Sequence, residues 1–150
     1  MMNRRAGGHL APVIATCVAL TGCGKPWDDY RWTASSAAFD LPISGTLDHR
    51  GQHDLLLHTA EEQDPWLVVD MLESRAVERI VVKNRLDCCQ ERGLPMVVEL
   101  RAANGSYVEV ARRSTPFDTW EIEIVAASAR YLRLRVEQKT FLHLHAIEIE

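Results

Sequence analysis

The sequence predicts an all-β domain, either a sandwich or a barrel, and three observations carry that prediction. Short stretches in which apolar and polar residues alternate recur along the chain, with turn-forming residues between them. Asn104-Gly105, the strongest short signal for a β-hairpin, lies between two of these stretches. From Ala37 onward no segment has a convincing helical periodicity, so strands must provide the core.

Seven segments are expected to form strands, and they are residues 65–71, 77–83, 96–102, 107–111, 120–125, 132–137 and 142–150. The alternation predicts which side chains face the core. In the segment 96–102, Val98 and Leu100 should point inward and Glu99 outward. On the returning segment 107–111, Val108 and Val110 should point inward.

The first 22 residues have the features of a signal peptide. Arg4 and Arg5 form a positive start, and the apolar run Leu10–Leu20 is too short to span a bilayer. The run ends in Leu20-Thr21-Gly22-Cys23, which resembles the lipobox of bacterial lipoprotein signal peptides. That resemblance implies an exported protein with a lipid anchor on Cys23, held in the cell envelope at the periplasmic or surface face of a membrane. An ordinary secretory signal cut nearby is the alternative.

We expect residues 23–36 to be a tether and residues 37–150 to form one domain. Removing residues 1–22 takes away Arg4 and Arg5 and no acidic residue, so the formal net charge changes from −4 to −6. An acidic chain lacks the basic face of a general nucleic-acid or anionic-membrane binder, so nucleic acid is not an expected partner.

The cysteine count changes with processing. Cys17 leaves with the signal peptide and Cys23 is the expected lipidation site, so Cys88 and Cys89 remain. In an oxidising compartment these two have only each other as partners. Adjacent thiolates are poor ligands for a tetrahedral metal, whereas a reversible thiol switch stays open as an alternative.

The stretch 84–92 carries the strongest chemical signal. Arg85 and Arg92 bracket Asp87 and the cysteine pair. Each arginine offers a planar fork of donors that binds two oxygens at once, and the aspartate can hold a fork still. If Cys88 and Cys89 bond to each other, their sulfurs offer a small apolar surface beside the positive charges of Arg85 and Arg92. Such a site suits a neutral, oxygen-rich ring with one apolar face, which describes a sugar.

A histidine at fixed spacing makes the pattern specific. His58 is followed by 26 residues, then Arg85-Leu86-Asp87, then four residues and Arg92, with Cys88-Cys89 inside the last gap. This arrangement resembles the fucose-binding motif of the F-type lectins, which belong to the discoidin-like (coagulation factor C-domain) group. The resemblance covers about residues 37–150 and implies a jelly-roll, galactose-binding-domain-like β-sandwich.

The resemblance also implies a role for each matched residue. His58, Arg85 and Arg92 would donate or accept hydrogen bonds with the oxygens of L-fucose, and Asp87 would orient the arginines. Cys88 and Cys89 would form a vicinal disulfide that packs against the sugar ring. Fucosylated glycans are therefore the expected partners, and an array on a membrane or an oligomer would raise avidity. A structural surface ion-pair cluster of Arg85, Asp87 and Arg92 is the alternative.

The opposite wall of the pocket departs from the family pattern. Residues 39–62 form a long segment without strand periodicity, in which Leu55, Leu56 and Leu57 are candidates to meet the sugar's methyl group. Of the calcium ligands that the family implies there and in the last strand, Asp48 is the candidate that remains, so any calcium site is expected to be weak or lost. His143 and His145 share one face of the last strand, which we expect to be a solvated edge; a transition-metal site is the alternative.

No nucleophile motif, phosphate-binding loop or HExxH pattern occurs, so we expect no enzyme activity. Several carboxylates alternate with apolar residues and should point outward: Glu121, Glu123, Glu148 and Glu150. The expected function is a carbohydrate-binding lipoprotein. The alternative is a discoidin-fold module for protein interaction or envelope assembly that does not bind fucose.

Overall fold

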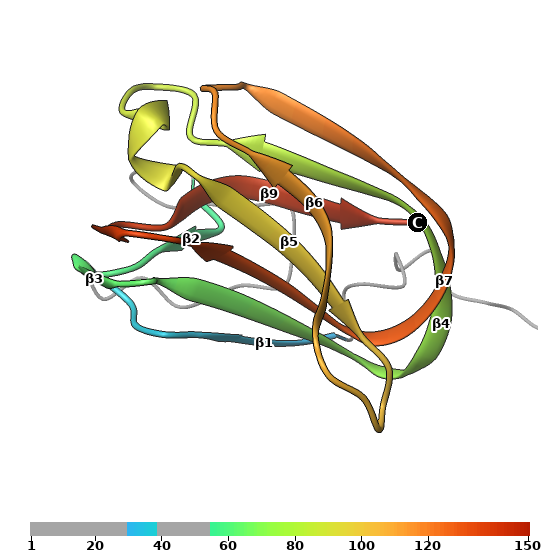
Figure 1. The fold of residues 1–150 in the computed structure, drawn as a ribbon. Helices are drawn as coiled ribbons and strands as arrows, with labels where there is room; N and C mark the ends of the chain where they lie inside the picture. The colour runs from blue at the N-terminus through green and yellow to red at the C-terminus, as the bar shows by residue number, and fades with distance from the viewer. Residues whose placement is uncertain (1–29, 39–54) are drawn as a thin grey trace, which may run out of the picture.

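The protein folds as a β-sandwich in a computed structural model that describes residues 30–38 and 55–150 (Figure 1). Neighbouring strands pair in the order β2-β9-β4-β7-β5-β6, β1 pairs with β4, and β3 pairs with β8. The elements are β1 (Arg31–Ala34), β2 (Leu57–His58), β3 (Glu62–Gln63), β4 (Trp66–Asn84), the 3₁₀ helix η2 (Gln90–Gly93), β5 (Met96–Arg101), β6 (Val108–Arg113), β7 (Thr119–Val136), β8 (Lys139–Thr140) and β9 (His143–Ile149).

Two long strands, β4 and β7, connect the layers of the sandwich. The first half of β4 pairs with β1 and with the second half of β7, which also pairs with β5. The second half of β4 pairs with β9 and with the first half of β7. Both strands curve at the right-hand edge of Figure 1, where the register shifts between Asp70 and Arg75 and again between Val77 and Arg79. Such shifts bend a strand, so one pair of strands serves both layers.

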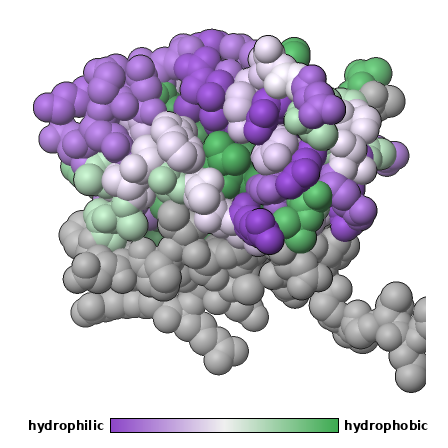
Figure 2. All heavy atoms as spheres, turned by 90° about the horizontal axis from the view of Figure 1, so that it is seen from below, coloured by the Kyte–Doolittle hydropathy of each residue, from purple (hydrophilic) through white to green (hydrophobic). Residues whose placement is uncertain are grey.

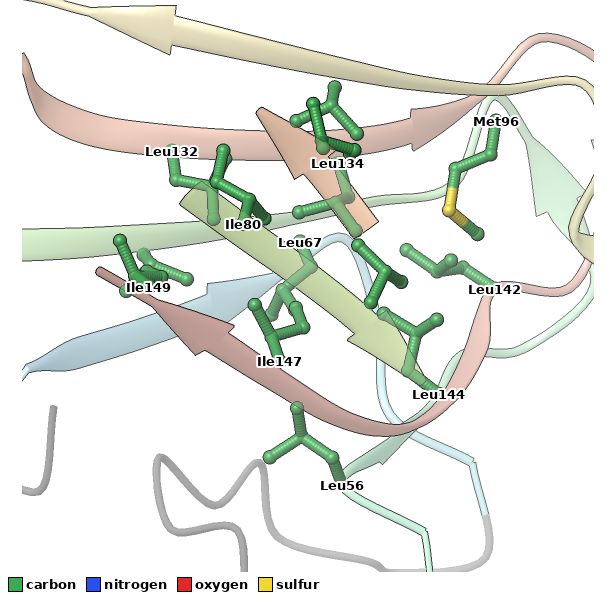
Figure 3. Packing of buried hydrophobic residues seen from close by; sticks show 14 of the residues in the cluster. Leu56, Leu67, Ile80, Met96, Leu132, Leu134, Leu142, Leu144, Ile147 and Ile149 are labelled. Carbon is green, nitrogen blue, oxygen red and sulfur yellow. The ribbon is translucent and has the colours of Figure 1, made fainter. Parts of the chain in front are cut away.

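The core lies between these layers. Leu67, Leu132 and Leu134 come from one layer and meet Ile80 and Ile147 from the other, and all five are 0% exposed (Figure 3). Alternation along each strand places these side chains on the inner face, and burying each one contributes roughly 1.5–3 kcal/mol.

The predicted fold class is confirmed, and the boundaries of several strands differ. The segments 65–71 and 77–83 form one strand, β4, and the segments 120–125 and 132–137 form one strand, β7. The polar stretch around Glu73 and Arg75 interrupts the alternation without ending the strand. Residues 31–34, assigned above to a tether, pair with β4 as β1, so the ordered domain reaches back at least to Tyr30.

The inward and outward assignments on the hairpin were partly wrong. Val108 is 63% exposed because it lies at the start of the edge strand β6. Glu99 is 6% exposed, since Arg133 donates to it at 2.5 Å and Arg135 lies 3.3 Å away. Two arginines on the neighbouring strand therefore cover a carboxylate that alternation alone would expose. Among the four outward glutamates, Glu148 is half-buried and pairs with Lys83 at 2.6 Å.

The described part of the chain contains no helix that is both long enough and apolar enough to cross a membrane. The predicted signal peptide, Cys23 and Asp48 lie outside the described residues. The lipid anchor and the calcium ligand therefore stay predictions.

Candidate functional site

Asn84 shapes the loop that follows β4. Its side chain is 0% exposed; Oδ1 accepts from the backbone N–H of Arg85 at 2.8 Å, and Nδ2 donates to the Gln90 carbonyl at 3.3 Å. Its own N–H donates to the carbonyl of Asp118 at 2.9 Å. One buried amide thus fixes both ends of the turn 85–90, because an amide side chain can donate and accept at once.

Arg85 and Asp87 form a two-point ion pair on this loop. Arg85 Nε and Nη2 donate to the two carboxylate oxygens of Asp87 at 2.5 and 2.8 Å. The side chain of Arg85 is 15% exposed and that of Asp87 is 62% exposed. The hydrogen bonds from Arg85 lower the pKa of Asp87 to about 2, so both groups stay charged at neutral pH. The pair fixes the plane of the Arg85 guanidinium, and Nη1 takes no part in the bonds to Asp87.

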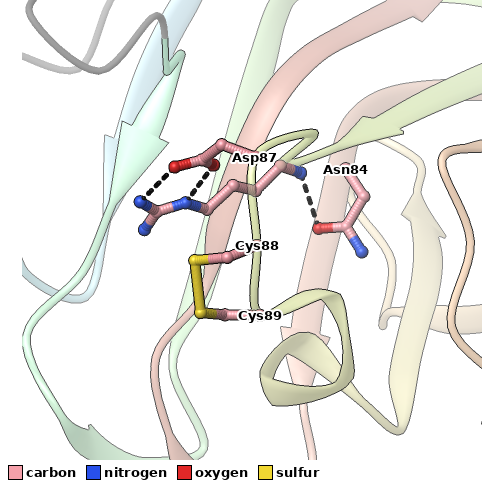
Figure 4. The surroundings of a disulfide bond; sticks show 5 residues. Asn84, Asp87, Cys88 and Cys89 are labelled. Atoms are coloured by element: carbon pink, nitrogen blue, oxygen red, sulfur yellow. Dashed lines mark hydrogen bonds and ion pairs between the residues drawn. A yellow bond between two sulfur atoms is a disulfide. The ribbon is translucent and has the colours of Figure 1, made fainter.

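Cys88 and Cys89 form the vicinal disulfide that the sequence predicted. Figure 4 shows the disulfide projecting from the loop, with Asp87 beyond one end of it. Cys88 is exposed and Cys89 is half-buried, so the sulfurs present an apolar surface to solvent. Cys89 adopts a left-handed backbone conformation, φ 64°, and its carbonyl accepts from the N–H of Arg92 at 3.1 Å. The disulfide is therefore continuous with the short helix η2.

Arg92 lies on η2 and is exposed. Its backbone carbonyl accepts a hydrogen bond from the hydroxyl of Thr140 at 2.8 Å, and its guanidinium carbon lies 5.8 Å from the ring centroid of Phe141. It forms no ion pair within the described part of the chain. Thr140 of β8 and the next residue, Phe141, therefore hold Arg92 in position.

His58 approaches from the edge strand β2. It is 5% exposed, and its Nδ1 lies 2.8 Å from the carbonyl of Thr59. A carbonyl can only accept, so Nδ1 carries a proton. The ring centroid of His58 lies 5.6 Å from that of Phe141, so one phenylalanine contacts both His58 and Arg92.

His143 was expected at a solvated edge, and that prediction was wrong. The structure buries it completely, on the strand between β2 and β4, with its ring centroid 5.4 Å from that of His58. Neither ring nitrogen has a hydrogen-bond partner among the described residues. Burial, followed by the positive charges of His58, Arg85 and Arg92, lowers the pKa of His143 to about 4. The alternation of apolar and polar residues could not predict the burial of His143, because it does not show that β9 is a central strand.

The structure therefore gathers most of the predicted residues. Half-buried Phe141 contacts both His58 and Arg92, His143 contacts His58, and the charges of Arg85 and Arg92 act on His143. Asp87 pairs with Arg85, and the disulfide follows Asp87 directly in the loop. The structure buries Leu55, Leu56 and Leu57, which are 3%, 0% and 2% exposed, so it does not place them as an open surface for the sugar's methyl group. Leu86 is the exposed leucine of this region, at 61%. Among the residues that the structure describes, no group of three metal-ligating side chains occurs.

The low pKa of His143 predicts a pH dependence of stability. Between pH 6.5 and about 4 the unfolded chain binds a proton at this residue that the folded domain does not bind. Lowering the pH across this window should therefore destabilise the fold, by at most about 1.4 kcal/mol per pH unit. We expect urea unfolding at pH 7, 6 and 5 to show a shallower slope for His143→Gln than for wild type. His145→Gln, half-buried on the same strand, is the control, and parallel slopes for wild type and His143→Gln would contradict the assignment.

Solved structures share this sandwich, which defines the class as a discoidin-like galactose-binding fold. The lectin domain of lectinolysin, complexed with Lewis B antigen, superposes with a TM-score of 0.70 at 24% identity, over 85% of this chain and 96% of that one. A fucose binding module of Streptococcus pneumoniae superposes with a TM-score of 0.72 at 17% identity, over 85% of this chain and 97% of that one.

The chain belongs to the NedA-like, galactose-binding domain family of the F5/8 type C group, whose model matches residues 50–134. Fucolectin-6 of Anguilla japonica is 26% identical over 138 residues, which are 88% of this chain and 74% of that protein. Fucolectin-5 of the same species is 32% identical over 72 residues, which are 46% of this chain and 38% of that protein.

Proposed function

We propose that this domain binds terminal L-fucose or a similar 6-deoxy sugar at the surface formed by His58, Arg85, Arg92 and the Cys88–Cys89 disulfide. The observation that carries the proposal is the fixed Arg85–Asp87 fork beside an exposed vicinal disulfide. The likeness to fucolectins and to fucose binding modules supports the same class of ligand.

The chemistry of the residues fits a neutral sugar. Arg85 Nη1 and the Arg92 guanidinium supply charge-assisted donors for ring and hydroxyl oxygens, and these bonds are about twice as strong as neutral ones. His58 lies beside these donors, because Phe141 contacts both its ring and the guanidinium of Arg92. The sulfurs of Cys88 and Cys89 cover an apolar ring face, and the exposed Leu86 offers a surface to the methyl group. These roles favour binding over catalysis.

Titration separates L-fucose from its closest neutral analogue. We expect L-fucose to bind more tightly than L-galactose, which has a hydroxyl in place of one methyl hydrogen, because an apolar surface leaves that hydroxyl unsatisfied. Calorimetry with the full domain measures both affinities. Equal affinities would contradict recognition of the 6-deoxy group, and no heat with either sugar would reject the lectin assignment.

We also propose that the mature protein is exported and anchored through a lipid on Cys23, as the lipobox pattern predicts. Expression in a bacterium followed by mass spectrometry of the mature N-terminus should find acylated Cys23. The variant Cys23→Ser should lose the acyl mass and leave the membrane fraction, because no other anchor is proposed. An unmodified N-terminus in the wild-type protein would exclude the anchor.

A further inference from the structure

A second group of side chains, at the opposite end of β5 from η2, has the features of an anion site. Arg101 ends β5 and is paired in register with Tyr131 on β7. Its guanidinium carbon lies 3.9 Å from the ring centroid of Tyr131 and 5.0 Å from that of Tyr107, which precedes β6. Arginine stacks well on aromatic rings, so the two tyrosines hold the guanidinium in a fixed plane.

Arg101 is unpaired, whereas the arginines beside it are not. Arg130, 5.0 Å from the ring of Tyr131, donates to both oxygens of Asp70 at 2.8 and 3.0 Å. Arg133, 3.9 Å from the ring of Tyr107, donates to Glu99 at 2.5 Å. Among the described residues Arg101 has no carboxylate partner, and its Nε is buried without a hydrogen bond. Its positive charge is therefore the one that this stack does not neutralise.

The phenol groups add two further polar atoms. Neither the Tyr107 nor the Tyr131 hydroxyl has a hydrogen-bond partner among the described residues. Both tyrosines are half-buried, and the ring of each contacts two arginines. Figure 2, which looks onto the end of the molecule that carries the turn between β5 and β6, shows hydrophilic, intermediate and hydrophobic side chains mixed on the described surface.

We propose that Arg101, Tyr107 and Tyr131 bind the carboxylate and neighbouring hydroxyl groups of a sugar acid. A planar, pre-oriented guanidinium binds a carboxylate through two parallel hydrogen bonds. A phenol both donates and accepts hydrogen bonds, so it can bind a hydroxyl group of the sugar acid. A simple carboxylate such as acetate has no such hydroxyl group. Arginines already contact the rings of both tyrosines, so the site recognises oxygen atoms through the edges of these side chains. This proposal does not depend on the fucose site, because β5 separates Arg101 from η2 by about 17 Å.

The test is a titration of the full domain with D-glucuronate, followed by NMR. D-glucose tests the need for the carboxylate, and acetate tests the need for the hydroxyl groups. We expect shifts centred on Arg101, Tyr107 and Tyr131 with glucuronate, weaker shifts with acetate and none with glucose. Binding should weaken as sodium chloride is raised, because salt screens the attraction between the guanidinium and the carboxylate.

Variants separate the sites. Arg101→Gln should weaken glucuronate binding at least tenfold, and Tyr107→Phe, which keeps the ring, should lower glucuronate binding toward that of acetate. Arg113→Gln is the matched control, since Arg113 also stacks on a ring, that of Phe117 at 5.0 Å, but donates to the Thr115 carbonyl. Arg85→Ala should leave glucuronate binding unchanged. Equal shifts with glucose, binding of acetate as strong as that of glucuronate, or no effect of Arg101→Gln in a folded variant would each overturn the proposal.

Discussion

Arg85→Ala is expected to weaken L-fucose binding by about tenfold to hundredfold, which corresponds to roughly 1–3 kcal/mol. The substitution removes a charged donor from the sugar oxygens. It also leaves the carboxylate of Asp87 without its partner, so a negative charge faces the oxygen-rich ligand. Calorimetric titration of the folded variant measures the loss.

Two further variants test whether the fork itself matters. Arg85→Lys keeps the charge but loses the planar pair of donors, so it should lose most of the affinity as well. Arg79→Ala is the control on the preceding strand β4, because Arg79 pairs with Glu121 and Glu150 away from the loop. Wild-type affinity in Arg85→Ala would show that the motif is a surface ion-pair cluster.

Leu134→Ala should destabilise the fold by about 2–5 kcal/mol, because it opens a cavity in the centre of the core. Leu134 is 0% exposed and pairs in register with Leu67 on β4 and Val98 on β5. Urea unfolding measures the change in the free energy of unfolding. Val125→Ala on the same strand is the control: Val125 is 97% exposed, so its loss should change stability by less than about 0.5 kcal/mol.

A small loss in Leu134→Ala would contradict the packing described here. It would mean that the two layers can close over the missing side chain, as a loosely packed core does. The result does not depend on the sugar site, since Leu134 lies on the inner face of β7 and contacts no residue of the loop 84–92 in register.

Local pattern predicted the class of fold and the loop that carries Arg85, Asp87 and the disulfide. Both depend on residues close in sequence: alternation within a strand, and a fixed motif within one turn. The joining of two predicted strands into β4 could not be foreseen, because the polar residues near Glu73 look like a loop. Their place at the curved edge of the sandwich depends on pairing with β7, which is a long-range contact.

The same reason explains the errors at His143 and Glu99. Each was assigned to solvent from the polarity of its side chain, yet tertiary neighbours bury both. His143 lies between β2 and β4, and Glu99 lies beneath arginines of β7. Asn84 and Thr140 likewise have partners distant in sequence, the carbonyls of Asp118 and Arg92. Supporting residues of this kind have no local motif.

The central claim is that L-fucose binds at the loop 84–92 and the adjoining edge of β2. The most direct measurement is a ¹H–¹⁵N NMR titration of the full domain with L-fucose, with assigned backbone signals. We expect saturable shifts at His58, Arg85, Cys88, Cys89 and Arg92, and none at Arg101. Shifts confined to another surface, or no shifts at millimolar sugar, would contradict it.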